Sequence, residues 1–181
     1  MADTATSFGI GDTVPSFSLT DTEGARHEVP AAQAPPATVL IQSCNHCPYV
    51  IAWNPRLRAV AEEYGPRGVR FLAINSNNPE SHPADSPQRM AQFVREQDWP
   101  IPYAFDESQD VARALGSERT PELFVLDSKQ RLAYHGAPDS DHGDPGQNAA
   151  WLRAALDAIL AGAAPEQSET PARGCSVKWR S

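Results

Sequence analysis

The stretch "VLIQSCNHCPYVIAWNP" (residues 39–55) decides the fold. A run of apolar residues leads to two cysteines, Cys44 and Cys47, and a proline follows at once. Strands buried on both faces have nearly continuous apolar sequences, and proline is favoured in the first turn of a helix. The stretch therefore predicts a buried strand over residues 38–43 and a helix that begins at Pro48, with both thiols at the junction.

The rest of the chain alternates predicted strands and helices, in the order β, β, β-α-β-α-β-β-α. This order is typical of an α/β protein in which a mixed central sheet is flanked by helices. Apolar periodicity and turn signals give the boundaries. We expect a hairpin over 16–29, strands over 69–76, 121–127 and 131–136, and helices over 48–64 (kinked or ended by Pro55), 87–98, 107–115 and 146–162.

The length of 181 residues fits one domain. We divide the chain into a leader (1–13), a domain (14–162) and a C-terminal extension (163–181) that carries Cys175. The net charge of −8, with no run of Lys or Arg, argues against nucleic-acid binding. The sequence contains no apolar segment of transmembrane length and no secretory signal pattern, so we expect no membrane partner and a cytoplasmic location.

The two central cysteines have the spacing of a redox-active pair. At the start of a helix, unpaired amides and the helix dipole are expected to stabilise the thiolate of Cys44, which is the nucleophile in thiol–disulfide exchange. Cys47, one helical turn later, is placed to attack the mixed disulfide formed by Cys44 and to release the reduced partner. Asn45 and His46 tune the pair, and a charged or hydrogen-bonding His46 favours a more oxidising disulfide.

Three further motifs accompany this pair. "CNHC" after a buried strand, together with "ERTPELFVLD" (118–127), resembles the thioredoxin superfamily. "GIGDTVPSFSLTDTEG" (9–24) is similar to the N-terminal hairpin of its AhpC/TSA and TlpA/ResA-like branch, and "GCSVKW" (174–179) to the tail of a bacterial peroxiredoxin-like group. The resemblance implies a thioredoxin fold with an N-terminal hairpin and a C-terminal tail. It also implies that Thr120 and Pro121 form a cis-proline element that binds an extended substrate segment.

The function implied by the resemblance is thiol–disulfide oxidoreduction. The catalytic residues would be Cys44 and Cys47, and their redox-active disulfide would replace any separate cofactor. The partners would be protein or small-molecule disulfides and thiols, with electrons from thioredoxin, glutathione or a similar donor.

A second function stays open, that of a thiol-dependent peroxidase in which Cys44 reacts with hydroperoxide. Peroxiredoxins place Thr or Ser three residues before the reactive cysteine and a proline four residues before that. This chain has Ile41 and Ala37 at those positions. The missing hydroxyl argues against an efficient peroxidase.

A copper- or zinc-binding module is the third possibility. Structural zinc needs four ligands, and the three cysteines with one histidine only just reach that number. Pro48 and His135 resemble elements of SCO-type copper chaperones, but that family separates its two cysteines by three residues.

Two residue assignments also stay open. The buried carboxylates that related proteins place near the pair are replaced here by Thr38 and Val50, which leaves Glu122 and His46 as candidate proton acceptors. Cys175 is either an accessory thiol brought to the site by the tail or a small apolar anchor of that tail.

Overall fold

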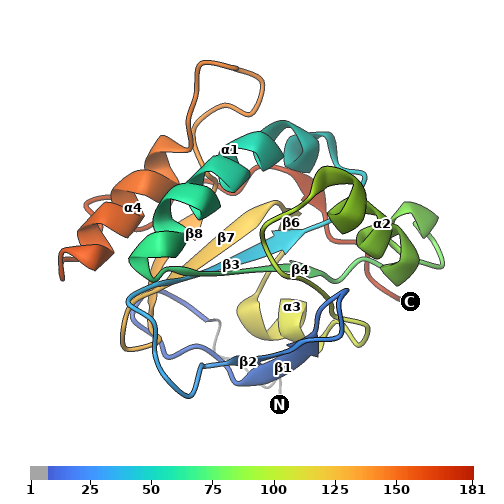
Figure 1. Cartoon of the computed structure of the whole chain (residues 1–181), viewed down its shortest axis with the longest axis horizontal. Helices are drawn as coiled ribbons and strands as arrows, with labels where there is room; N and C mark the ends of the chain where they lie inside the picture. The colour runs from blue at the N-terminus through green and yellow to red at the C-terminus, as the bar shows by residue number, and fades with distance from the viewer. Residues whose placement is uncertain (1–7) are drawn as a thin grey trace, which may run out of the picture.

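A five-stranded mixed sheet forms the centre of the computed structural model, which describes residues 8–181. Its strand order is β5-β4-β3-β7-β8 (Figure 1). The three strands β3, β4 and β5 are parallel, whereas β7 runs antiparallel to both β3 and β8. The strands are β3 (Thr38–Ser43), β4 (Arg70–Asn75), β5 (Tyr103–Phe105), β7 (Glu122–Leu126) and β8 (Leu132–Gly136).

Helices cover both faces of this sheet. In Figure 1, α1, α2 and α4 lie on one face, and α3 lies on the other with the N-terminal hairpin. This arrangement confirms the predicted fold class, a mixed sheet flanked by helices. The elements are α1 (Pro48–Tyr64), α2 (Pro87–Gln97), α3 (Asp110–Leu115), α4 (Ala150–Leu160) and the hairpin β1 (Phe17–Thr20) and β2 (Arg26–Val29).

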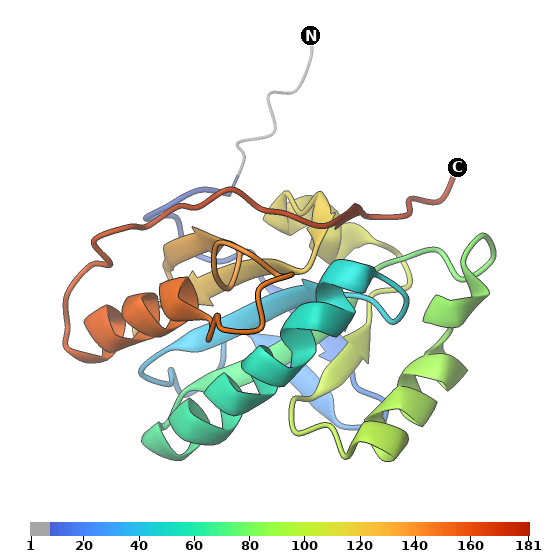
Figure 2. The same cartoon turned by 90° about the horizontal axis from the view of Figure 1, so that it is seen from above.

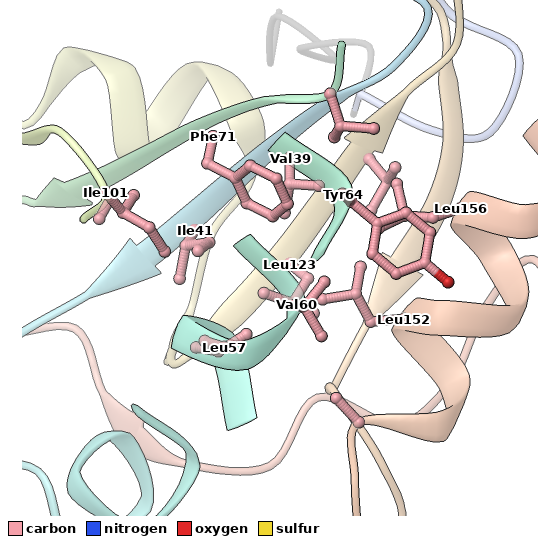
Figure 3. Packing of buried hydrophobic residues seen from close by; sticks show 14 of the residues in the cluster. Val39, Ile41, Leu57, Val60, Tyr64, Phe71, Ile101, Leu123, Leu152 and Leu156 are labelled. Carbon is pink, nitrogen blue, oxygen red and sulfur yellow. The ribbon is translucent and has the colours of Figure 1, made fainter. Parts of the chain in front are cut away.

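The larger hydrophobic core lies between the sheet and the helices α1 and α4 (Figure 3). Every residue of β3 is buried, as its apolar sequence predicts. Burial of one large aliphatic side chain stabilises a fold by about 1.5–3 kcal/mol. Because β3 and α1 both contribute side chains to this core, their packing holds the junction between them in place. The members of this core include Val39, Ile41, Leu57, Val60, Leu123, Leu152 and Leu156.

Helix α1 has its predicted bounds and continues through Pro55, so of the two effects expected of this proline, a kink or an end, the end was wrong. The ring of Pro55 is exposed, while Trp53 and Leu57 on either side are buried, so tertiary packing outweighs the lost backbone hydrogen bond. Helix α4 begins at Ala150, later than predicted, because Ala149 is in the left-handed conformation with φ 61°.

The expected leader (1–13) can be followed from residue 8 onward. Residues 1–7 lie outside the described part of the chain. The amide of Gly11 donates to the carbonyl of Leu132 (2.8 Å), and the amide of Leu132 donates to the carbonyl of Asp12 (2.9 Å). The end of the leader is therefore bound beside β8.

The C-terminal extension runs along the domain and does not hang free. Figure 2 shows it, in red, passing from α4 to the opposite end of the molecule. It ends in a short strand, β9 (Cys175–Ser176), which pairs antiparallel with β6 (Arg119–Thr120). None of the helices within residues 8–181 has the length and apolar character needed to span a bilayer.

Candidate active site

The two central thiols lie in the short connection between the end of β3 and the start of α1. Cys47 is the N-cap residue of α1, and Cys44 lies in the turn before it. Both are free thiols, with 3% of Cys44 and 0% of Cys47 exposed. The residue at the helix start is therefore Cys47, whereas the sequence analysis expected the helix amides to face Cys44.

Both thiols contact Thr120. Its hydroxyl oxygen lies 3.4 Å from Sγ of Cys44, and its carbonyl oxygen accepts a hydrogen bond from Sγ of Cys47 at 3.2 Å. The peptide bond from Thr120 to Pro121 is cis, as the resemblance implied. The strand β6 and the turn before α1 thus meet at the sulfur atoms.

The two thiols titrate as a pair. The hydrogen bond from Cys44 lowers the pKa of Cys47 to about 4, against the opposing effect of burial, and Cys175 and the amide of Val50 lower it further. The same thiol–thiol hydrogen bond, together with burial, raises the pKa of Cys44. The first ionisation therefore belongs to the pair of sulfurs and not to either thiol alone. The expectation that Cys44 is the attacking thiolate stays a prediction.

A buried carboxylate lies beside the pair, and the sequence analysis missed it. Asp85 is completely buried, and its Oδ2 lies 2.5 Å from Nδ1 of His46. Its Oδ1 accepts a hydrogen bond from the amide of Asn45 at 2.6 Å. The side-chain amides of Asn75 and Asn77 also donate to Asp85, at 3.2 and 3.0 Å. The carboxylate therefore fixes the two residues between the cysteines.

Asn45 connects the pair to the loop that carries this carboxylate. Its side-chain amide donates to the carbonyl of Ala84 (2.9 Å), and its side-chain oxygen accepts from the hydroxyl of Tyr103 (2.9 Å). The ring of His46 stacks on that of His82, with centroids 5.3 Å apart. Asn45 and His46, expected to tune the pair, are thus held rigidly next to it.

Glu122 holds the chain before the cis-proline. Its Oε2 accepts hydrogen bonds from the amides of Glu118 (2.8 Å) and Arg119 (3.0 Å), and its Oε1 lies 2.7 Å from Nε2 of His135. Burial alone would raise the pKa of Glu122, but these hydrogen bonds lower it. Glu122 is therefore a positioning group for β6. His135, which the copper hypothesis used, is paired with Glu122.

The third cysteine also reaches the site. Cys175 packs against the cluster of Cys44, Cys47 and Val50. Burial and the neighbouring Cys47 raise the pKa of Cys175 to about 11. The structure thus brings together the residues predicted for the redox site: Cys44, Asn45, His46, Cys47, Thr120, Pro121 and Cys175.

One group of side chains has the spacing of metal ligands. Single ligand atoms of Cys44, His46 and Asp85 all lie within 4.8 Å of one another. The oxygens of Asp85 already accept three hydrogen bonds, from Asn45, Asn75 and Asn77, and one of them also contacts His46. A metal would have to displace several of these contacts.

The comparisons with known proteins agree with this fold. The chain is 36% identical to an uncharacterized conserved protein from Geobacillus kaustophilus, covering 97% of this chain and 94% of that chain with a TM-score of 0.90. It is 33% identical to a hypothetical protein from Sinorhizobium meliloti, covering 97% of each chain with a TM-score of 0.90. Peroxidoxin BcpB from Mycobacterium tuberculosis shares the fold at 18% identity and a TM-score of 0.63, over 86% of this chain and 97% of that chain. A search of curated proteins found no match.

A mixed sheet flanked by helices, with two thiols at a helix start beside a cis-proline, defines a redox protein of thioredoxin fold. The AhpC/TSA family model matches residues 10–135, and the chain belongs to that family. The narrower peroxiredoxin-like group with the "GCSVKW" tail stays a prediction.

Proposed function

We propose that the protein is a thiol–disulfide oxidoreductase whose redox centre is the pair Cys44 and Cys47. The observation that carries this proposal is the meeting of both sulfurs at Thr120, the residue before the cis-proline. The two thiols pack in one buried cluster and contact the same residue, so they are placed to form a disulfide with each other. The lowered pKa of Cys47 keeps one thiolate on the pair at neutral pH.

In the proposed reaction, Cys44 attacks an external disulfide because it keeps slight exposure, whereas Cys47 has none. As its sulfur bonds to one substrate sulfur and the substrate disulfide breaks, the proton of Cys44 passes to the thiolate of Cys47 along their hydrogen bond. Cys47 then gives its proton to the released thiolate and attacks the sulfur of Cys44. The second substrate thiol leaves, so one disulfide has been reduced to two thiols and the pair has been oxidised.

Glutathione disulfide provides the test. The reduced protein should release two equivalents of glutathione per chain and end with a disulfide within the "CNHC" peptide. Cys47→Ser should stop after one equivalent, as a mixed disulfide on Cys44. Release from Cys175 alone, with the central pair left reduced, would overturn the proposal.

A peroxidase activity is the second candidate, and one observation favours it. The hydroxyl of Thr120, 3.4 Å from Sγ of Cys44, supplies a hydrogen-bonding group of the kind that Ile41 cannot provide. Hydroperoxide would oxidise Cys44 to a sulfenic acid, and attack by Cys47 would release water and form the same disulfide. Sulfenic acid trapped on Cys44 in Cys47→Ser, together with consumption of hydroperoxide, would support this activity.

The copper- or zinc-binding alternative rests on the cluster of Cys44, His46 and Asp85. Stoichiometric metal that blocks alkylation of Cys44 would favour it over the oxidoreductase. The oxidoreductase proposal includes four further points. The protein would need no separate cofactor, and its partners would be disulfides and thiols. It would bind neither nucleic acid nor membrane, and it would be located in the cytoplasm.

A further inference from the structure

The C-terminal extension places a third thiol against the redox pair by backbone pairing. In the register of β6 and β9, Cys175 lies opposite Thr120, the residue that contacts both Cys44 and Cys47. Cys175 also packs against the buried cluster that holds Cys44 and Cys47. Three sulfur atoms are therefore gathered around one threonine.

This placement is built into the structure on both sides of Cys175. A Cβ atom on Gly174 would lie 2.0 Å from the carbonyl oxygen of Thr120, so only glycine permits this approach. On the other side, the amide of Val177 donates to the carbonyl of Glu118 at 3.0 Å. The amide of Lys178 donates to the side-chain oxygen of Asn77 at 2.8 Å. The same Asn77 also donates to Asp85, which links the extension to the redox pair.

The three thiols differ in their access to solvent. Cys44 and Cys47 are buried, whereas Cys175 is only partly buried. The extension covers the pair, and an external thiol that approaches this face meets Cys175 first. A thiol that is both accessible and in contact with a buried redox sulfur has the position of a relay.

We propose that Cys175 is the thiol through which reducing equivalents enter the oxidised pair, by exchange with Cys47. This inference rests on the proposed function, because it presupposes a disulfide between Cys44 and Cys47. The reductant would be an external monothiol, a molecule with a single thiol group.

The exchange balances in three steps. In the oxidised pair Cys47 carries no charge that opposes ionisation of Cys175, and Lys178 and Arg119 favour it. The thiolate of Cys175 attacks the sulfur of Cys47, which breaks the central disulfide, forms a Cys47–Cys175 disulfide and frees Cys44 as a thiolate. An external thiolate then attacks Cys175, which frees Cys47 and leaves a mixed disulfide on Cys175. A second external thiolate attacks the outer sulfur, which restores Cys175 and releases the external disulfide. The protons of the two external thiols pass to the reduced pair.

The charges near Cys175 favour a negatively charged thiol. Arg119 and Lys178 lie close enough to its sulfur to stabilise negative charge there. Neither makes an ion pair with a carboxylate within residues 8–181. On a chain with a net charge of −8, this is a local positive patch, and it should attract an anionic monothiol more strongly than a cationic one.

The test starts from full-length protein oxidised at the central pair and follows reduction by glutathione, with acid quenching, alkylation and peptide mass spectrometry. Cys175→Ser should slow reduction about tenfold or more, because the serine keeps the extension in place but cannot exchange. Ser168→Ala, elsewhere in the extension, is the matched control and should match the parent. Equal rates for Cys175→Ser and the parent would overturn the relay.

A second variant traps the relay disulfide and does not depend on rates. Cys44→Ser, oxidised with diamide, should form the Cys47–Cys175 disulfide within one chain. A free Cys175 after complete oxidation, with Cys47 linked to another chain, would overturn the proposal. If the parent forms no Cys44–Cys47 disulfide at all, the proposed function itself fails, and that result is distinct from a failure of the relay.

The charge argument has its own readout. The ratio of the rates with glutathione (anionic) and cysteamine (cationic) should fall several-fold in a variant that combines Arg119→Gln and Lys178→Gln. An unchanged ratio would remove the preference for an anionic thiol.

Discussion

Nδ1 of His46 lies 2.5 Å from Oδ2 of Asp85, a carboxylate with no exposed surface. These residues come from segments distant in the sequence, the turn between the two cysteines and the loop before α2. Because of this contact, the positions of the residues between the two cysteines depend on the loop that carries Asp85. Several consequences of this arrangement can be measured.

Replacement of Asp85 should weaken both the fold and the exchange reaction. Asp85→Asn substitutes an NH₂ group for an oxygen that accepts hydrogen bonds, and each buried group left unpaired costs about 1–3 kcal/mol. The turn that holds Asn45 and His46 should loosen, and the rate of glutathione disulfide reduction should fall about tenfold. Urea unfolding and stopped-flow exchange measure the two effects. Asp98→Asn, at a position where asparagine tolerates the left-handed backbone, is the control; equal effects of the two variants would contradict the role of Asp85.

The hydroxyl of Thr120 should control the reactivity of Cys44. This hydroxyl lowers the pKa of Cys44 against larger opposing effects, so its removal in Thr120→Val should raise that pKa further. We expect alkylation of Cys44 at pH 8 to slow several-fold in Thr120→Val and to recover in Thr120→Ser. The rate is measured by iodoacetamide labelling and peptide mass spectrometry. A Thr120→Val rate equal to that of the parent would show that the 3.4 Å contact has no chemical effect.

One thiolate per chain should be present well below pH 8.5, the ordinary value for a free cysteine. The hydrogen bond from Cys44 lowers the pKa of Cys47 to about 4, while the pKa of Cys44 is raised, so the second ionisation of the pair comes late. Thiolate absorbance at 240 nm measures this. At pH 7 the parent should exceed the double variant Cys44→Ser/Cys47→Ser by about one thiolate. Identical absorbance of the two proteins up to pH 8 would contradict the shared charge.

Glu122 should contribute stability that depends on pH. Its pKa is lowered in the folded chain, so the contribution is complete above its unfolded value of about 4.3 and is lost as pH falls through the folded value. Glu122→Gln should cost about 1–3 kcal/mol at pH 7, and the difference from the parent should shrink in acid. Urea unfolding at neutral and acid pH measures it. Glu166 is exposed, so the control variant Glu166→Gln should have the stability of the parent at neutral and at acid pH. A loss of stability in Glu122→Gln that is the same at both pH values would count against the prediction.

The sequence predicts the local part of this structure well. The apolar run of β3, the proline at the start of α1 and the two thiols between them act over a few residues, so periodicity and turn chemistry identify them. The cis bond before Pro121 came from the family resemblance. In each case the signal lies within one segment.

The parts that sequence reasoning missed depend on long-range contacts. Asp85 lies in a polar, proline-rich segment whose composition indicates only a surface loop, and its burial follows from donors on β4, just after β4 and in the turn after β3. The strand at Cys175 has two residues, too few for any periodicity, and its position depends on pairing with Thr120. The distribution of charge between Cys44 and Cys47 depends on both of these contacts, so it could not follow from the spacing alone.

Cys44 and Cys47 should form a reversible redox pair. A titration of the full chain in glutathione buffers of graded potential, followed by alkylation and mass mapping of every cysteine, measures this property. We expect a two-electron step in which the Cys44–Cys47 disulfide is the main product and is fully reversed in reducing buffer. A pair that stays reduced in the most oxidising buffer would contradict it.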